Sequence, residues 1–183
     1  MMLLPEFEDI EYLKSGSPIQ RKAYYTLIRS KILYHLQSFR PVLTGTLPLD
    51  IFLEGKSDLD IVCQSNTFKT VEKILLKEYA HHELFFCEQK KIQETETLLC
   101  RFVCEGFPFE IFCQQRQVKE QLAYRHMIAE YKLLQRYGEP LKNRVIELKA
   151  SGVKTEPAFA NALGLKGDPY RALLLFEQDL KTP

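Results

Sequence analysis

The sequence predicts an α/β fold in which a small mixed sheet with flanking helices is followed by a C-terminal helical lobe. Short strand-like apolar runs alternate with amphipathic helical stretches as far as residue 115, and from Gln117 onward the apolar spacing is helical only. The chain has 183 residues, of which 45% are hydrophobic, so it can bury a full core. We therefore expect a core domain at residues 1–115 and a helical lobe packed on it at residues 116–183.

The elements of the first part follow from caps, breakers and apolar periodicity. Ser17-Pro18 predicts a helix start, and the apolar spacing keeps one face through about Gln37, before Pro41. A second helix is expected at 67–80. Glu105-Gly106 separates two apolar runs and predicts a hairpin. The predicted strands are 42–45, 58–63, 84–87, 97–104 and 107–113.

The last part of the chain is predicted to be helical. A long helix is expected at 118–137, and Gly138 is a typical terminator before a second helix at 140–151. Thr155 is expected to cap a third helix that ends at Gly164. Asp168, followed by proline, is expected to cap a fourth.

Composition excludes several classes of protein. With 25 basic and 24 acidic residues the formal net charge is +1, so a nucleic-acid or anionic membrane partner is not indicated. No apolar run approaches the roughly 18 residues of a membrane span. The first residues, MMLLPEFEDIEYLK, do not resemble a signal peptide, and the 5 cysteines are an odd number lying in apolar runs. We expect reduced thiols, no zinc site and a cytoplasmic protein.

The stretch that carries chemistry is GTLPLDIFLEGKSDLDI, residues 45–61. Strand alternation places Asp58 and Asp60 on one face, about 7 Å apart along the strand. Two carboxylates held side by side repel each other, and a divalent cation removes that repulsion. Ligands that are all oxygen favour Mg²⁺ or Mn²⁺ over zinc. Gly45 lets the backbone approach a phosphate, to which the Thr46 hydroxyl can donate a hydrogen bond.

A third acid, Glu110, interrupts the apolar run Phe-Pro-Phe-Glu-Ile-Phe. If its strand lies beside the Asp58–Asp60 strand, all three carboxylates converge, and three carboxylates can hold two cations. The alternative interpretation is structural. The SDLD segment can be a turn followed by a solvated strand edge, and Glu110 can be the outward residue of an edge strand.

This pattern resembles the nucleotidyltransferase (polymerase β-like) superfamily, whose members have a Gly-Ser turn, a spacer, an acidic pair on a strand and a third acidic strand. The whole chain, through GVKTEPAFANALGLKGDPYRALL, resembles the bacterial DUF4269 family of that superfamily. The resemblance implies a metal-dependent enzyme that transfers a nucleotidyl group from an NTP to an acceptor. It implies Asp58, Asp60 and Glu110 as catalytic metal ligands and Gly45 and Thr46 as phosphate contacts. Thr46 and Glu110 depart from the more frequent Ser and Asp.

Other candidates have competing structural interpretations. Lys56 and Ser57 precede Asp58 and are candidate phosphate contacts, or else form a polar turn. His126 is expected to be a packed, hydrogen-bonded helix residue rather than a base. An alternative function is a catalytically silent nucleotide-binding module with a regulatory or interaction role. The acceptor, the preferred base and the oligomeric state do not follow from the sequence.

Overall fold

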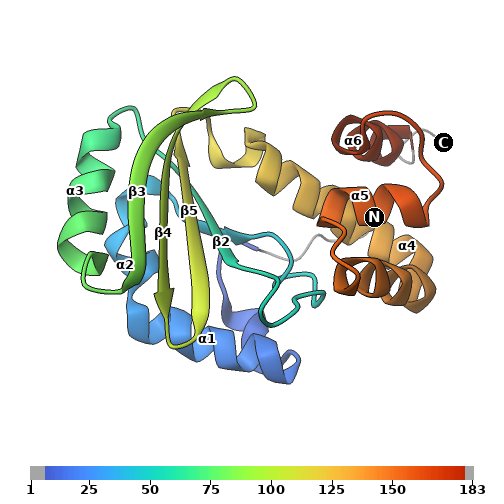
Figure 1. Ribbon diagram of the computed structural model, residues 1–183, viewed down its shortest axis with the longest axis horizontal. Coiled ribbons are helices and arrows are strands. Elements are labelled where there is room, and N and C mark those ends of the chain that lie inside the picture. Colours follow the sequence, from blue (N-terminus) through green and yellow to red (C-terminus); the bar gives the residue numbers. More distant parts are fainter. Residues whose placement is uncertain (1–6, 180–183) are drawn as a thin grey trace. The chain divides into compact units, whose positions relative to one another are not determined.

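A computed structural model describes residues 7–179, with side chains as far as residue 176. It contains two compact units (Figure 1). The first consists of the described residues up to Thr44 together with Asp58–Gln121, and the second of Gly45–Ser57 and the described residues from Leu122 onward. The division at residue 115 stays a prediction. Residues 1–6, on which the expectation about a leader depends, lie outside the described residues.

The first unit is built on a five-stranded sheet with the order β1-β2-β5-β4-β3. β2 and β5 are parallel and the other neighbours are antiparallel, so the sheet is mixed. Together with the helices described below, this confirms the predicted α/β fold class. The strands are β1 Val42–Thr44, β2 Leu59–Gln64, β3 Glu83–Ile92, β4 Thr95–Cys104 and β5 Phe107–Gln114.

Three helices belong to this unit, α1 Pro18–Ser30, α2 Ile32–His35 and α3 Phe68–Tyr79. The predicted start of α1 is confirmed, since Ser17 and Gln20 form a reciprocal capping box. The predicted continuation to Gln37 is wrong. Lys31 takes a left-handed conformation with φ 56°, and the Ser30 hydroxyl accepts a hydrogen bond from the Ile32 amide at 3.4 Å. A serine side chain that bonds to nearby backbone competes with the helix, which explains the break.

The β4–β5 hairpin around Glu105-Gly106 is confirmed, but β3 is longer than predicted. Its second half, EQKKI, lacks the apolar character of a buried strand. β3 lies at the edge of the sheet and pairs with β4 through its backbone, and an edge strand tolerates polar side chains. Because residues 88–92 are mostly polar, the apolar spacing does not predict the second half of β3.

The helices and the candidate acids of this unit belong to opposite faces of the sheet. α3 packs against β3, β4 and β5, and the Tyr79 ring stacks on Phe102 with centroids 4.8 Å apart. Phe102 in turn stacks on Phe109, also at 4.8 Å. Because successive side chains in a strand alternate, Arg101 and Glu110 point to the face away from α3.

The second unit contains α4 Leu122–Ala150, α5 Thr155–Ala162 and α6 Pro169–Asp179, which pack against one another. α4 starts later than predicted, because residues 118–120 form a 3₁₀ turn. Gly138 interrupts α4 as expected, with a φ of 63° that favours glycine.

The predicted caps of the last two helices had different outcomes. Asp168 caps α6, its carboxylate accepting from the Arg171 amide at 2.9 Å. The Thr155 cap is wrong, since Thr155 is the first helical residue after Lys154.

The cysteines and the helices relate to two expectations from the sequence, reduced thiols and the lack of a membrane span. All 5 cysteines are free thiols, four of them buried and Cys87 partly exposed. Within residues 7–179, every helix is too short or too polar to cross a membrane.

Candidate functional site

A row of polar side chains crosses the face of the sheet that points away from α3, which we call the open face. Asp60 on β2 is the register partner of Glu110 on β5, and Glu110 is the register partner of Arg101 on β4. Partners in register project to the same face, so these three side chains lie next to one another. Two of the three sequence-predicted acids are therefore neighbours on adjacent strands.

Asp58 immediately precedes β2 and belongs electrostatically to the same group. Its negative charge raises the pKa of Glu110, and both carboxylates are acted on by the positive charge of Arg101. Asp58, Asp60 and Glu110 are each partly buried. Asp58 thus lies close enough to Glu110 and Arg101 to interact with both through its charge.

Burial is the main cause of the raised pKa of two of these acids. It raises the pKa of Asp58, which Arg101 opposes. Burial also raises the pKa of Glu110, again opposed by Arg101. The sequence predicts repulsion between Asp58 and Asp60, but the main cause of the raised pKa of Asp58 is the loss of water around its carboxylate.

Arg101 is the functional candidate that sequence reasoning missed. Its Nε forms an ion pair with the Glu110 carboxylate, while half of the Arg101 side chain remains exposed (50%) and Glu110 is 18% exposed. A sequence signal was present, because Arg101 interrupts the apolar run Leu-Leu-Cys-Arg-Phe-Val-Cys just as Glu110 interrupts its own strand. Only the register of β4 on β5 shows that the two charges meet.

The other predicted site residues belong to the second unit. Gly45 follows β1 in the chain and has a φ of 73°, a left-handed conformation that favours glycine. The Thr46 hydroxyl oxygen is buried and has no hydrogen-bond partner among residues 7–179. Such a buried hydroxyl is costly unless something binds it. The hydrogen bonding of the Thr46 hydroxyl is thus incomplete within the described residues.

Lys56 and Ser57 have structural partners within that unit. The Lys56 ammonium donates to the carbonyl of Ala150, the last residue of α4, where a positive charge suits the helix dipole. The Ser57 hydroxyl accepts from the Leu53 amide at 3.1 Å. These contacts account for both residues as parts of a turn, so their role as phosphate contacts stays a prediction.

His126 has the structural role expected of it. It is buried on α4, and its Nε2 donates to the Tyr170 carbonyl at 3.1 Å, while its Nδ1 lies 3.7 Å from the Glu156 carboxylate. The prediction of a packed, hydrogen-bonded histidine is confirmed.

The chemistry of the acids fits one divalent cation of the magnesium type. Such ions take carboxylate oxygens from one or two side chains and complete their shell with water and substrate phosphates. Asp58, Asp60 and Glu110 each carry a carboxylate, and that of Glu110 is paired with Arg101. Among the described residues, no group of three His, Cys, Asp or Glu side chains is placed to hold a metal ion. The oxygen donors of Asp58 and Asp60 are of the kind that such an ion takes, and a metal site at these residues stays a prediction.

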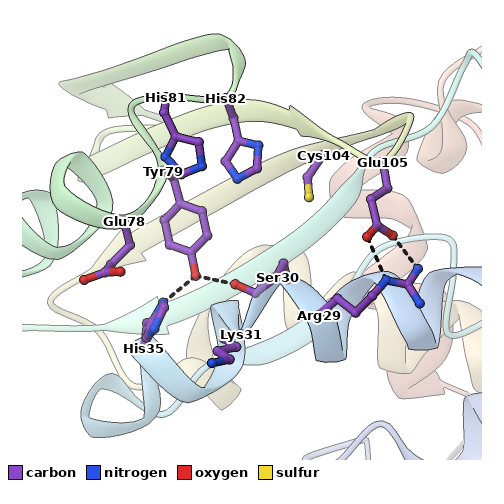
Figure 2. A pocket seen from close by; sticks show the side chains of 10 residues that line it. All are labelled: Arg29, Ser30, Lys31, His35, Glu78, Tyr79, His81, His82, Cys104 and Glu105. Carbon is purple, nitrogen blue, oxygen red and sulfur yellow. Dashed lines mark hydrogen bonds and ion pairs between the residues drawn. The ribbon is translucent and has the colours of Figure 1, made fainter.

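The first unit also has a cavity of about 580 Å³ lined by the ends of α1 and α3, residues just beyond them and the β4–β5 turn. Figure 2 shows the hydrogen bonds and ion pairs between side chains that line it. The Tyr79 hydroxyl donates to the Ser30 carbonyl at 2.9 Å, so the His35 Nδ1, 2.7 Å away, must donate its proton to the Tyr79 oxygen. Arg29 is held by two hydrogen bonds to Glu105. These pairings, and the preference of helix C-termini for positive charge, explain the basic lining without a ligand.

The Glu105 contact predicts a pH-dependent contribution to stability. Hydrogen bonds from Arg29 and then Thr26 lower the pKa of Glu105 from 4.5 to about 2. A lowered carboxyl pKa stabilises the fold above the unfolded value and loses that stabilisation as the pH falls from about 4.5 to about 2. Since the pair is exposed, we expect Glu105→Gln to cost below about 1 kcal/mol at pH 7 and much less near pH 2. Denaturant unfolding at several pH values measures this difference.

The control for this prediction is Glu147→Gln, which removes an exposed carboxylate paired with Arg144 at 3.2 Å in the second unit. It should change stability less than Glu105→Gln. A Glu105→Gln effect that is the same at pH 7 and near pH 2 would show that the ion pair contributes nothing.

A sequence model of the family described as "Domain of unknown function (DUF4269)" matches residues 25–176, most of the chain. The chain belongs to the DUF4269 family. No curated protein matches this DUF4269 chain in sequence.

Solved structures identify the fold of this DUF4269 chain as nucleotidyltransferase-like. Cid1, which has RNA terminal uridylyl transferase activity, is 12% identical with a TM-score of 0.55 over 84% of this chain and 52% of Cid1. The polymerase core of TRAMP, an RNA surveillance complex, is 14% identical with a TM-score of 0.51 over 95% of this chain and 53% of that one. The CdnE c-di-GMP synthase from Capnocytophaga granulosa is 13% identical with a TM-score of 0.54 over 94% and 74%. The chain thus spans about half the length of Cid1 and of the TRAMP core.

Proposed function

We propose that this protein transfers a nucleotidyl group from an NTP to an acceptor hydroxyl or phosphate, with Mg²⁺ or Mn²⁺ held by Asp58 and Asp60. The observation that carries the proposal is the register of β2 on β5, which pairs Asp60 with Glu110 on the open face of a nucleotidyltransferase-like sheet. The structural alternative is a solvated strand edge with an outward Glu110. It does not explain why Asp58, Asp60 and Glu110 are all partly buried. Glu110 is proposed as the third acid of the catalytic group.

For the nucleotide phosphates we propose Gly45 and Thr46. The left-handed Gly45 leaves no Cβ in the way of an approaching phosphate, and the buried Thr46 hydroxyl lacks a protein partner among the described residues. Lys56 and Ser57 are secondary candidates for the same phosphates. The bound cation would neutralise phosphate charge during an in-line displacement. The protein's own task is to position the groups and stabilise the developing charge.

The acceptor is open, and we propose none. The neighbours that share the fold are named for different reactions, one for the transfer of uridylyl groups to RNA ends and another for the synthesis of c-di-GMP. The near-neutral net charge of +1 gives no support for nucleic acid as the acceptor. A cytoplasmic setting accords with the free thiols and is proposed with the rest.

Thermal-shift screening tests the proposal. A ligand that binds only the folded state raises the melting temperature, by an amount equivalent to about 2.7 kcal/mol at 100 times Kd. We expect at least one NTP to raise the melting temperature with Mg²⁺ or Mn²⁺ and to do so much less in EDTA. If every NTP leaves the melting temperature unchanged with either metal, or shifts it equally in EDTA, metal-dependent nucleotide binding is refuted.

A further inference from the structure

Arg101 lies beside Glu110, the third acid of the group. It is the register partner of Glu110, its Nε is bonded to the Glu110 carboxylate, and its charge reaches Asp58. An arginine side chain keeps its charge at all physiological pH values and presents several N–H donors to oxygen acceptors. The guanidinium is therefore a permanent positive charge built into the acidic group.

The Arg101–Glu110 ion pair already places a positive charge on this side of the acidic group. The Nε of Arg101 is bonded to the Glu110 carboxylate, which is 18% exposed. A carboxylate can accept from more than one partner, but a metal ion on Glu110 would lie beside the Arg101 guanidinium, and the two like charges would repel each other.

We propose that Arg101 takes the place of a second metal ion, so that the site binds a single divalent cation at Asp58 and Asp60. This inference rests on the proposed function, because it concerns the same site. Glu110 then acts through Arg101, which it orients, and Arg101 faces the bound nucleotide from the Glu110 side. Half of the Arg101 side chain is exposed, which leaves N–H donors available beyond the Glu110 contact.

The stoichiometry of Mn²⁺ tests this inference without an assay of turnover. Equilibrium dialysis is carried out with the full chain, Mn²⁺ and one equivalent of a non-hydrolysable NTP analogue. The wild type should bind one Mn²⁺ per chain. Arg101→Gln frees the Glu110 carboxylate and should raise the number to two, while Arg101→Lys keeps the charge and should stay at one.

Lys90→Gln is the matched control, because it removes a positive charge that acts on Glu110 without the Arg101 hydrogen bond. It should leave the number at one. Arg101 is half exposed, so Arg101→Gln should fold, and a melting curve of each variant verifies this. Should Arg101→Gln unfold, Arg101→Met tests the same loss of charge. One Mn²⁺ per chain in whichever of these variants folds would overturn the inference.

The outcomes separate this inference from the proposed function. Two Mn²⁺ per wild-type chain would overturn the role of Arg101 and leave the proposed function standing. One Mn²⁺ in both the wild type and Arg101→Gln would do the same. No bound Mn²⁺ in any variant would overturn the proposed function and this inference with it.

Discussion

Asp58→Asn should weaken the binding of Mg²⁺–NTP at least about tenfold, equivalent to about 1.4 kcal/mol, while the nucleotide-free protein melts no lower than the wild type. The binding loss follows from replacing a hard anionic oxygen ligand by a neutral amide. At a ligand concentration of 100 times the wild-type Kd, the stabilisation by the ligand should fall from about 2.7 to about 1.4 kcal/mol. Melting curves with and without Mg²⁺–NTP measure both quantities.

The stability half of this expectation follows from the pKa of Asp58. Burial raises that pKa, so the ionised carboxylate is less stable in the folded protein than in the unfolded chain. The fold therefore loses stability as the pH rises through the folded pKa of Asp58, and Asn removes that loss. The variant should equal the wild type in acid, where both side chains are neutral, and match or exceed it at pH 7.

Two further variants sharpen the comparison. Asp60→Asn should lose nucleotide binding in the same way. Glu96→Gln removes a carboxylate from the same sheet, at an exposed position 3.9 Å from Lys91, and should keep the full nucleotide-induced shift. An Asp58→Asn protein that melts well below the wild type yet keeps the full shift would instead identify Asp58 as a structural residue.

Phe102→Ala should have the largest effect on stability of any substitution considered for this chain. The Phe102 ring is 1% exposed and lies between Tyr79 and Phe109, with both centroids 4.8 Å from its own. Truncating a buried phenylalanine removes transfer free energy and leaves a cavity, at a cost of about 3–5 kcal/mol. For a chain of this size we expect the melting temperature to fall by roughly 6–20 °C.

Phe86→Ala on the neighbouring edge strand is the matched control, since Phe86 is 46% exposed. It should change the stability by no more than about 0.5 kcal/mol. Calorimetry of the three proteins makes the comparison. Melting of Phe102→Ala within about one degree of the wild type would mean that the aromatic stack does not hold α3 to the sheet.

The sequence carries the local features of this fold well. The capping box of Ser17 with Gln20 and the Glu105-Gly106 hairpin are each specified by residues close together in the chain, and local rules are sufficient to predict them. The break at Lys31 depends on one serine hydroxyl, and the polar half of β3 depends on an edge position. Neither leaves a pattern in the apolar spacing.

The candidate site likewise combines features that local patterns predict with features that depend on distant contacts. Glu110 is recognisable because it interrupts an apolar run, and Asp58 and Asp60 because they alternate with apolar residues. The Arg101–Glu110 pair depends on the register between two strands, which no local pattern specifies. The structural partner of Lys56 is likewise the backbone carbonyl of Ala150, which lies far outside residues 45–61. The sequence therefore indicated which residue types matter better than it indicated what each of them contacts.

The most direct test of the central claim is the position of Mn²⁺ in crystals grown with a non-hydrolysable NTP analogue. Manganese scatters anomalously, so its location can be determined independently of the protein geometry. The account predicts an anomalous peak about 2.1 Å from carboxylate oxygens of both Asp58 and Asp60, with the same ion bound to the triphosphate. A nucleotide and a manganese ion bound elsewhere, with Asp58 and Asp60 in contact with neither, would contradict it.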